Sequence, residues 1–184
     1  MKCGCPIAAT RNWVNDVVIA LALCPWAKRS IHSHTTRFKL SNANNKQQLA
    51  MAIQDEIQHL LHNPNLETTL LVHPHVLDTW DEFYPFLNSI EQSIRESSID
   101  EDIQVVGFHP DFEFAGELPS DPSHWTNRSP FPTCHILRQQ AVTVALDGHD
   151  ESLSITSTNQ DTLRKLGSGR MRVLLHQCMQ NPPD

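Results

Sequence analysis

Long hydrophobic runs are missing from this sequence of 184 residues. The longest covers residues 17–24 and is far shorter than the roughly 20 apolar residues that a membrane-spanning helix needs. Residues 1–12 are mixed polar and lack the apolar segment and cleavage site of a secretory signal peptide. We therefore expect a cytoplasmic protein that has no membrane partner.

An excess of positive charge is missing too. Lys and Arg number 14 against 21 Asp and Glu, which gives a net charge of −7 when every His is neutral. Nucleic acids and anionic membrane surfaces select clusters of Lys and Arg, so we expect neither of them as a partner. The 11 His side chains titrate near neutrality, so this net charge depends on pH.

The cysteines form no disulfide framework. Their odd number and irregular spacing are typical of a protein from a reducing compartment. Cys3 and Cys5 could hold a metal, but they stand at a chain terminus without other ligands nearby, so we expect no role for them. Cys24 and Cys134 lie in apolar segments, where a free cysteine behaves as a small hydrophobe.

The composition and the periodicity predict one folded domain. With 39% hydrophobic and 19% charged residues, the chain can bury a core. Its length fits a single domain over residues 1–184, with flexible tails at 1–9 and 181–184. Apolar residues at helical spacing predict a helix from Thr10, a second over 46–62 and a third from Asp78.

Strands are predicted over residues 35–40, 68–72 and 103–108. The last two end in His-Pro and enclose a predicted helix, which implies a parallel crossover between neighbouring strands. His73 and His109 would then leave the same carboxyl edge of the sheet, where open α/β sheets place ligands. We therefore predict an α/β or α+β fold with a small, at least partly parallel sheet covered by helices.

Proline dominates the segment that follows. Residues 111–132 form a long loop whose aromatic content argues against disorder, so we expect a functional loop. A helix is predicted over 132–146, because proline is favourable at a first helical position. A turn at 147–150, a short extended piece at 153–155 and a helix break at 167–169 complete the prediction.

Four segments carry a resemblance to a known family. They read LCPWA at 23–27, ETTLLVHP at 67–74, GFHPDF at 107–112 and TNRSPFP at 126–132. Together with His135 and Arg138, they resemble a bacterial family known by number as domain of unknown function 1415, over roughly residues 14–174. The resemblance implies no reaction. Gln139 and His124 depart from the pattern expected for the family, so no role is carried over to them.

A divalent metal site is the first functional hypothesis. His109 and Asp111 form a His-x-Asp pair at a strand exit, and His135 lies on the helix predicted after the loop. Two imidazoles and one carboxylate leave a coordination position of the metal open, as in catalytic zinc and non-haem iron sites. Glu67 or His73 could add a ligand or an outer hydrogen-bond partner. The alternative is a structural role for both residues. His109 would cap the end of its strand, and the Asp111 carboxylate would accept hydrogen bonds from backbone amides of the turn.

An anion pocket is the second constellation. Asn127, Arg128 and Ser129 precede the helix predicted from 132, whose N-terminal amides attract negative charge, and Arg138 could turn toward the same region. The planar guanidinium suits a carboxylate or phosphate on a small molecule. Alternatively, Arg128 ties its own loop together by bonding carbonyl groups.

Three functions follow from these sites. The first is a metal-dependent hydrolase or oxygenase, in which His109, Asp111 and His135 are catalytic and the arginines orient a small anionic substrate. The second is a non-catalytic domain that binds a small anion or a protein. The third is a thiol-based redox protein that uses Cys24, although the end of a helix raises the pKa of a thiol there and favours a packing role. The remaining His residues are expected mostly at the surface: His32, His34, His59, His62, His75, His124, His149 and His176.

Overall fold

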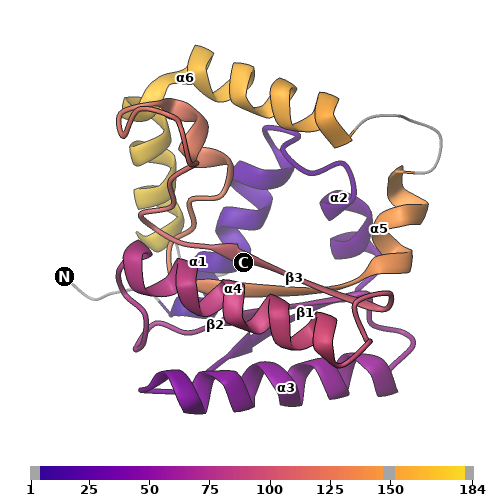
Figure 1. Cartoon of the computed structure of the whole chain (residues 1–184). Helices are drawn as coiled ribbons and strands as arrows, with labels where there is room; N and C mark the ends of the chain where they lie inside the picture. The colour runs from indigo at the N-terminus through magenta and orange to yellow at the C-terminus, as the bar shows by residue number, and fades with distance from the viewer. Residues whose placement is uncertain (1–4, 147–151, 181–184) are drawn as a thin grey trace.

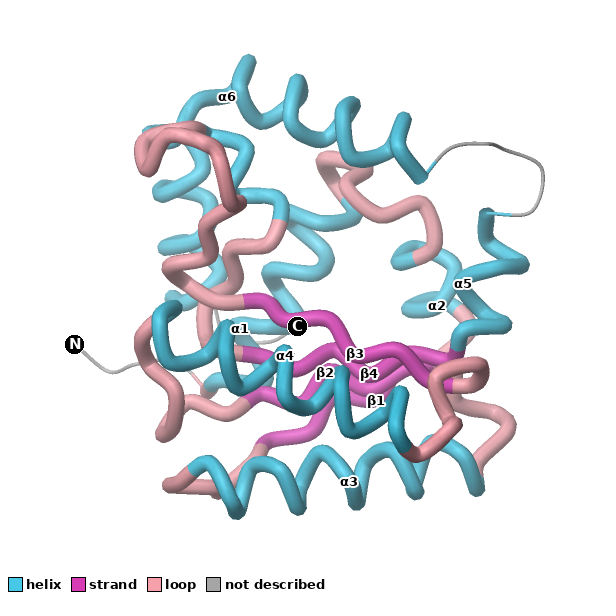
Figure 2. Tube along the Cα trace, in the orientation of Figure 1, coloured by secondary structure: helices cyan, strands magenta, loops and turns pink. Residues whose placement is uncertain are grey.

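A mixed sheet of four strands lies at the centre of the protein (Figures 1 and 2). The computed structural model describes residues 5–146 and 152–180. The strand order is β1-β2-β4-β3, with β1 (Thr36–Leu40) parallel to β2 (Thr68–Val72). β4 (Thr133–Arg138) runs antiparallel to both β2 and β3 (Ile103–Phe108). The predicted α/β class with a partly parallel sheet is confirmed.

Helices cover both faces of this sheet. One face packs on α3 (Lys46–His62) and α4 (Trp80–Glu96), which Figure 1 shows along the lower side of the strands. The other face lies toward helical segments that include the start of the chain and its C-terminal part. Among these segments are α1 (Pro6–Trp13), the π-helix η1 (Val14–Ile19), α2 (Ala27–His32) and α6 (Ser152–Gln180).

The strongest sequence patterns give the expected elements. The helix predicted over 46–62 is α3, which buries Leu49, Ile53, Ile57 and Leu60 on one side. The side chain of Asn45 caps it by accepting a hydrogen bond from the Gln48 amide at 2.9 Å. The strands predicted over 68–72 and 103–108 are also confirmed with the same bounds.

The helix predicted over residues 132–146 is wrong in its first half. Residues 133–138 form the central strand β4, and α5 (Gln139–Leu146) starts only after it. β4 pairs along its whole length with β2 on one side and β3 on the other. These two hydrogen-bonded ladders, together with burial of Cys134 and Ile136 under α3 and α4, outweigh the local helical pattern.

The insertion of β4 changes the neighbours of the His-Pro strands. β2 and β3 are parallel to each other as predicted, but they are not adjacent, because β4 lies between them. The neighbouring parallel pair is β1 and β2, joined through α3. His73 and His109 nevertheless leave the sheet at the same edge.

Two predictions outside the sheet need correction. α1 begins at Pro6, so residues 6–9 are helical rather than part of a tail, and Ala8 and Ala9 are buried. Residues 153–155 belong to α6 instead of an extended piece. The break at Gly167 is confirmed by its φ of 77° and ψ of 152°. The turn predicted at 147–150 and the tail at 181–184 lie outside the described residues.

Gly107 allows α4 to pack closely on β3. A Cβ atom at this position would lie 2.6 Å from Leu87 Cδ2 and 2.7 Å from Phe83 Cε1. We expect Gly107→Ala to lower the free energy of unfolding by about 2 kcal/mol, because the added methyl overpacks a filled core. Urea denaturation monitored by circular dichroism measures this loss.

Gly169→Ala is the matched control. Gly169 lies exposed in α6, and a Cβ there would meet nothing within 4 Å. Alanine favours the helix over glycine, so this variant should unfold at the same or a higher urea concentration than the wild type. Equal destabilisation by the two substitutions would contradict the close contact at Gly107.

Candidate functional site

The carboxyl edge of the sheet holds two buried imidazoles. His73 and His109 are inaccessible to solvent, and both rings lie against Phe83, at centroid distances of 5.3 and 5.5 Å. His73 Nδ1 lies 3.1 Å from the Val76 carbonyl oxygen, and His109 Nε2 lies 3.2 Å from that of Leu77. Each of these nitrogens therefore donates a hydrogen bond. Burial lowers the pKa of both imidazoles, that of His73 to about 4, so both are neutral at pH 7.

The second nitrogen of each ring is occupied as well. His109 Nδ1 accepts a hydrogen bond from the Asp111 amide at 3.0 Å. His73 Nε2 lies 3.6 Å from Cys134 Sγ and accepts from that thiol. Protein groups therefore occupy the lone pairs that a metal would need. His109 caps the end of its strand, which is the structural role predicted as the alternative to metal binding.

His135 lies on the opposite face of the sheet from His109. Side chains alternate along a strand, and Cys134 packs in the core under α3 and α4. The side chain of His135 therefore points to the other face, where it contacts Phe108. The three predicted metal ligands do not converge, because His135 stands on a strand instead of the predicted helix. Among residues 5–146 and 152–180, no group of three or more His, Cys, Asp or Glu side chains could hold a metal ion.

The two arginines of the predicted anion pocket lie at opposite ends of β4. Arg128 Nε donates to the Phe112 carbonyl oxygen at 3.0 Å, and its guanidinium lies 5.1 Å from the ring centroid of Trp125. Arg138 is paired with Ile103, at the other end of β3. The length of a six-residue strand, roughly 17 Å, separates the two sites. Arg128 therefore stabilises its own loop through the Phe112 carbonyl, which is the alternative to a role in anion binding.

The other predicted site residues make structural contacts. The Asn127 carbonyl oxygen accepts from the His109 amide at 3.2 Å, and Ser129 Oγ donates to the Phe131 carbonyl at 2.7 Å. Glu67 stands at the start of β2, the opposite end from His73, and pairs with Arg29 at 3.0 Å. None of these three side chains therefore joins His109 in one cluster.

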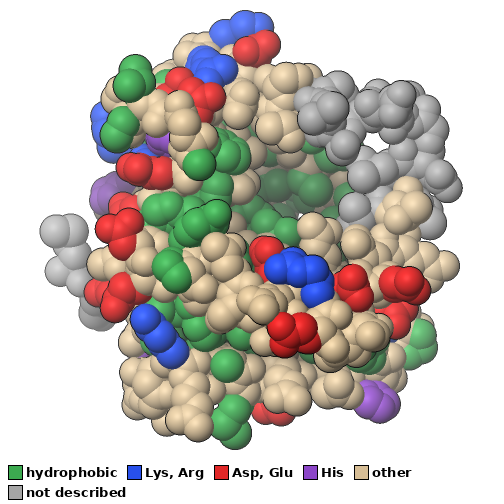
Figure 3. All heavy atoms as spheres, viewed as in Figure 1, with side chains coloured by type: hydrophobic (Ala, Val, Ile, Leu, Met, Phe, Trp, Pro, Cys, Tyr) green, Lys and Arg blue, Asp and Glu red, His purple; other side chains and the backbone are tan. Residues whose placement is uncertain are grey.

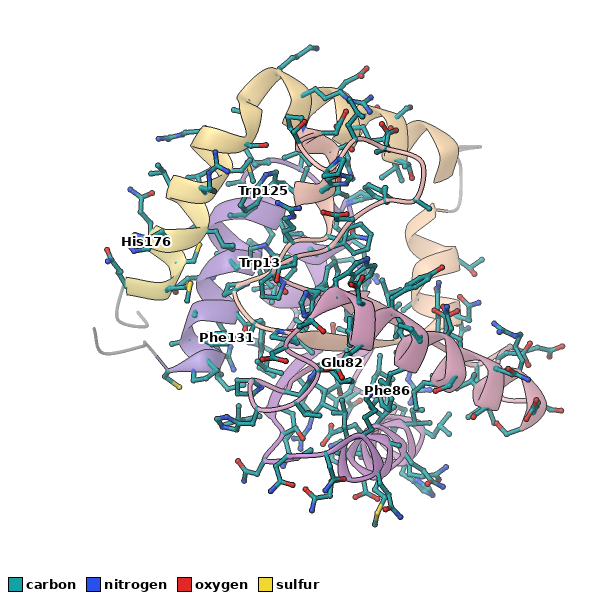
Figure 4. The ribbon with its side chains drawn as sticks, turned by 60° about the vertical axis from the view of Figure 1, so that its left-hand side comes forward. Trp13, Glu82, Phe86, Trp125, Phe131 and His176 are labelled. Carbon is teal, nitrogen blue, oxygen red and sulfur yellow. The ribbon has the colours of Figure 1, made fainter. Side chains whose placement is uncertain are left out.

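His124 is a buried residue that the sequence placed at the surface. Its Nδ1 accepts from the Phe114 amide at 3.1 Å, and its Nε2 donates to the Leu118 carbonyl at 2.8 Å. His124 belongs to the short 3₁₀-helix η2 (Pro122–Thr126), and its ring connects this helix to the preceding part of the proline-rich loop. The surface prediction is confirmed for His32, His34, His62, His75 and His176; Figure 4 shows His176 on the outer side of α6.

A cavity of about 450 Å³ lies on the sheet face that His135 occupies. Figure 3 shows a hollow with hydrophobic side chains at its base. Strand side chains form its floor, and apolar side chains of α1, η1 and the segment 23–31 form a wall. Ile155, Thr156 and Asn159 of α6 also line the cavity. The floor includes Thr68, Leu70, Val106, Phe108, His135 and Leu137, and the wall includes Val14, Val18, Leu23, Trp26 and Ile31.

His135 is the polar centre of this apolar floor. Its ring lies 6.2 Å from Trp26 and 5.7 Å from Phe108, inclined by 30° and 34°. The imidazole makes no hydrogen bond with any described residue, and its nitrogens are not sealed from the cavity. Desolvation lowers the pKa of His135 to about 3, so the ring is neutral and offers one N–H donor and one acceptor.

Two further polar side chains of the cavity are available to a ligand. Gln104 is two residues before Val106 on β3, and Asn127 lies next to the end of that strand. Neither side-chain amide makes a hydrogen bond with the described residues. By contrast, Thr68 Oγ1 donates to Ile136 O and Asn159 Nδ2 donates to Leu23 O, both at 2.7 Å.

Cys24 also lines the cavity, which sequence reasoning did not predict. Burial raises the pKa of its thiol, with hydrogen bonds from the backbone of Trp26 and Ala27 acting in the opposite direction. The thiol is therefore protonated at neutral pH.

The pocket residues left only a weak sequence signal. His135 and Leu137 alternate with Cys134 and Ile136, whose side chains lie on the other face of the sheet, and this alternation is the period of a strand. The run is too short to be distinguished from a helix by pattern alone. The wall residues come from a segment whose apolar character predicts a core-facing helix equally well.

Fold and site define an α/β domain that carries an apolar pocket on one face of a mixed four-stranded sheet. No helix in the described ranges combines the length and apolarity needed to cross a bilayer. The chain belongs to the family described as Protein of unknown function (DUF1415), whose model matches residues 6–173. No curated protein and no solved structure matches the chain.

Proposed function

We propose that the protein binds a small, uncharged and largely apolar molecule in the pocket above the sheet. The observation that carries the proposal is the imidazole of His135, neutral and without a hydrogen bond among the described residues, on an apolar floor. His135 is half-buried and open to the cavity, so a ligand that excludes solvent from the ring has to supply its hydrogen-bond partner.

The size and the lining of the pocket support this proposal. A volume of about 450 Å³ falls within the range of small-molecule sites, which extends from roughly 300 to 1,000 Å³. Such sites are mostly apolar and contain a few polar groups that orient the ligand. His135, Gln104 and Asn127 would provide these groups.

The lining also favours an uncharged ligand over the anion expected from the sequence. No Lys, Arg, Asp or Glu among the described residues lines the pocket. An ion placed there would lose its hydration without gaining an opposite charge. Arg128 and Arg138 bind backbone carbonyls elsewhere and are not part of the pocket lining.

A neutral fluorescent probe tests this function. N-phenyl-1-naphthylamine should bind saturably to the wild type, with enhanced fluorescence, because the pocket excludes water from its rings. Val18→Phe should weaken binding at least tenfold, since Val18 lines the wall and a larger side chain there occupies the cavity. Fluorescence titration at pH 7 gives both dissociation constants.

Val173→Phe is the matched control, because Val173 is 48% exposed on α6 and does not line the pocket. It should bind the probe as the wild type does. The proposal fails if the wild type shows no saturable binding, or if Val18→Phe binds the probe as well as Val173→Phe does.

A further inference from the structure

We infer that the ligand is a planar heteroaromatic molecule with an uncharged polar edge that both donates and accepts hydrogen bonds, and that Gln104, His135 and Asn127 bind this edge. This inference rests on the proposed function and specifies the chemical class of ligand for the same pocket.

Aromatic faces support the planar shape. Trp26 and Phe108 flank His135, and their rings are inclined to the imidazole by 30° and 34°, so the faces are far from perpendicular. Trp13 adds a further indole to the lining. Aromatic side chains interact with another flat ring through stacked or edge-on contacts, which gain energy beyond burial of area. The pocket therefore offers more to a flat ring than to an alkyl chain.

Three uncharged groups define the polar edge. A neutral imidazole donates one hydrogen bond and accepts one, and each side-chain amide does both. None of the three has a hydrogen-bond partner among the described residues. Gln104 is exposed, whereas His135 and Asn127 are half-buried. A ligand that hydrogen-bonds to these groups carries donors and acceptors and needs no net charge, as in a ring lactam.

The arrangement of these groups places the polar atoms along one side of the ligand. His135 is paired with Val106, which lies midway between Gln104 and Phe108 on β3, and Asn127 follows beyond Phe108. Four residues of strand span roughly 13 Å, so the row extends along the pocket. The facing wall contains Val14, Val18 and Leu23. The pocket thus has polar groups along one side and apolar side chains on the other. A fused ring system with one polar edge matches this arrangement, whereas an alkyl alcohol has its polar group at one end only.

Competition against N-phenyl-1-naphthylamine at pH 7 tests the ligand class with four probes. Quinazolin-4-one is flat and carries a donor and an acceptor, naphthalene is flat without either, 2-naphthoate is flat and anionic, and 1-decanol is an alkyl alcohol. We expect quinazolin-4-one to displace the fluorophore at a concentration at least tenfold lower than any of the others.

The variant His135→Phe keeps an aromatic ring on the floor and removes both hydrogen-bonding atoms. We expect it to lose the tenfold preference for quinazolin-4-one over naphthalene while it binds naphthalene at least as tightly as the wild type does. Its melting temperature should equal or exceed that of the wild type, because an unpaired polar group leaves an apolar site. His75→Phe, at an exposed position, should retain the preference.

The outcomes separate the two proposals. Equal displacement by quinazolin-4-one and naphthalene, or a preference that survives in His135→Phe, overturns the polar edge and leaves the pocket function intact. Stronger displacement by 1-decanol overturns the planar shape, and stronger displacement by 2-naphthoate overturns the uncharged class. If the fluorophore itself does not bind the wild type, the proposed function fails, and the ligand class fails with it.

Discussion

Arg138→Met should lower the free energy of unfolding by about 3 kcal/mol, because the guanidinium closes the C-terminal end of α3. Arg138 Nε donates to the Leu66 carbonyl at 2.9 Å. Its Nη2 donates to Leu60 O, with weaker contacts at 3.4 Å to Leu61 O and Asn63 O. The last carbonyls of a helix have no partner within the helix, and a cation there also opposes the negative end of the helix dipole.

Urea denaturation at pH 7 measures this loss, and two variants sharpen the comparison. Arg138→Lys keeps the positive charge but cannot reach several carbonyls at once, so its loss should be intermediate. Arg164→Met is the control, because Arg164 forms surface ion pairs with Glu117 and Asp121, each at 3.2 Å. It should change stability far less. If Arg164→Met costs as much as Arg138→Met, the carbonyl cluster is not the source of the effect.

Acidification should remove about 3 kcal/mol of stability through His73 alone. The folded protein holds the pKa of His73 at about 4, against an ordinary value of 6.5, because burial disfavours the imidazolium ion. Between these values the unfolded chain binds the proton and the folded chain does not, so unfolding becomes easier as the pH falls. The contribution is complete above pH 6.5 and is lost progressively down to about pH 4, at about 1.4 kcal/mol per pH unit.

Urea denaturation at several values between pH 7 and pH 4.5 tests this contribution. His73→Asn should lower the slope of unfolding free energy against pH by about 1.4 kcal/mol per pH unit, because the amide does not titrate. His109 and His135, whose pKa values burial also lowers, should leave a residual slope. His75→Asn, two residues away and exposed, should keep the full slope of the wild type. Identical slopes in the two variants would show that His73 does not carry the effect.

Local patterns were sufficient for the elements that bury one face over several turns or strand residues. The helix α3 and the strands β2 and β3 follow their hydrophobic periods, and the Asn45 cap marks the start of α3. The same patterns placed His73 and His109 at one edge of the sheet. They also indicated the local roles of His109 and Arg128, which were the alternatives to metal and anion binding.

The candidate pocket was not predictable in this way. It depends on β4, whose six residues satisfy a helical pattern as well as an extended one. Only pairing with β2 and β3 makes them a strand, and that pairing turns His135 away from His109. The pocket wall comes from the beginning of the chain and part of its lining from α6, so no local segment contains the site.

The sequence by itself determined the α/β class, most helices and strands, and membership of a family, because local periodicity and long motifs carry that information. Tertiary structure alone decided which side chains meet, because a central strand is fixed by hydrogen bonds to segments remote in the sequence. That same pairing separates His135 from His109, so the candidate site is a neutral imidazole in an apolar pocket instead of a metal site formed by both histidines.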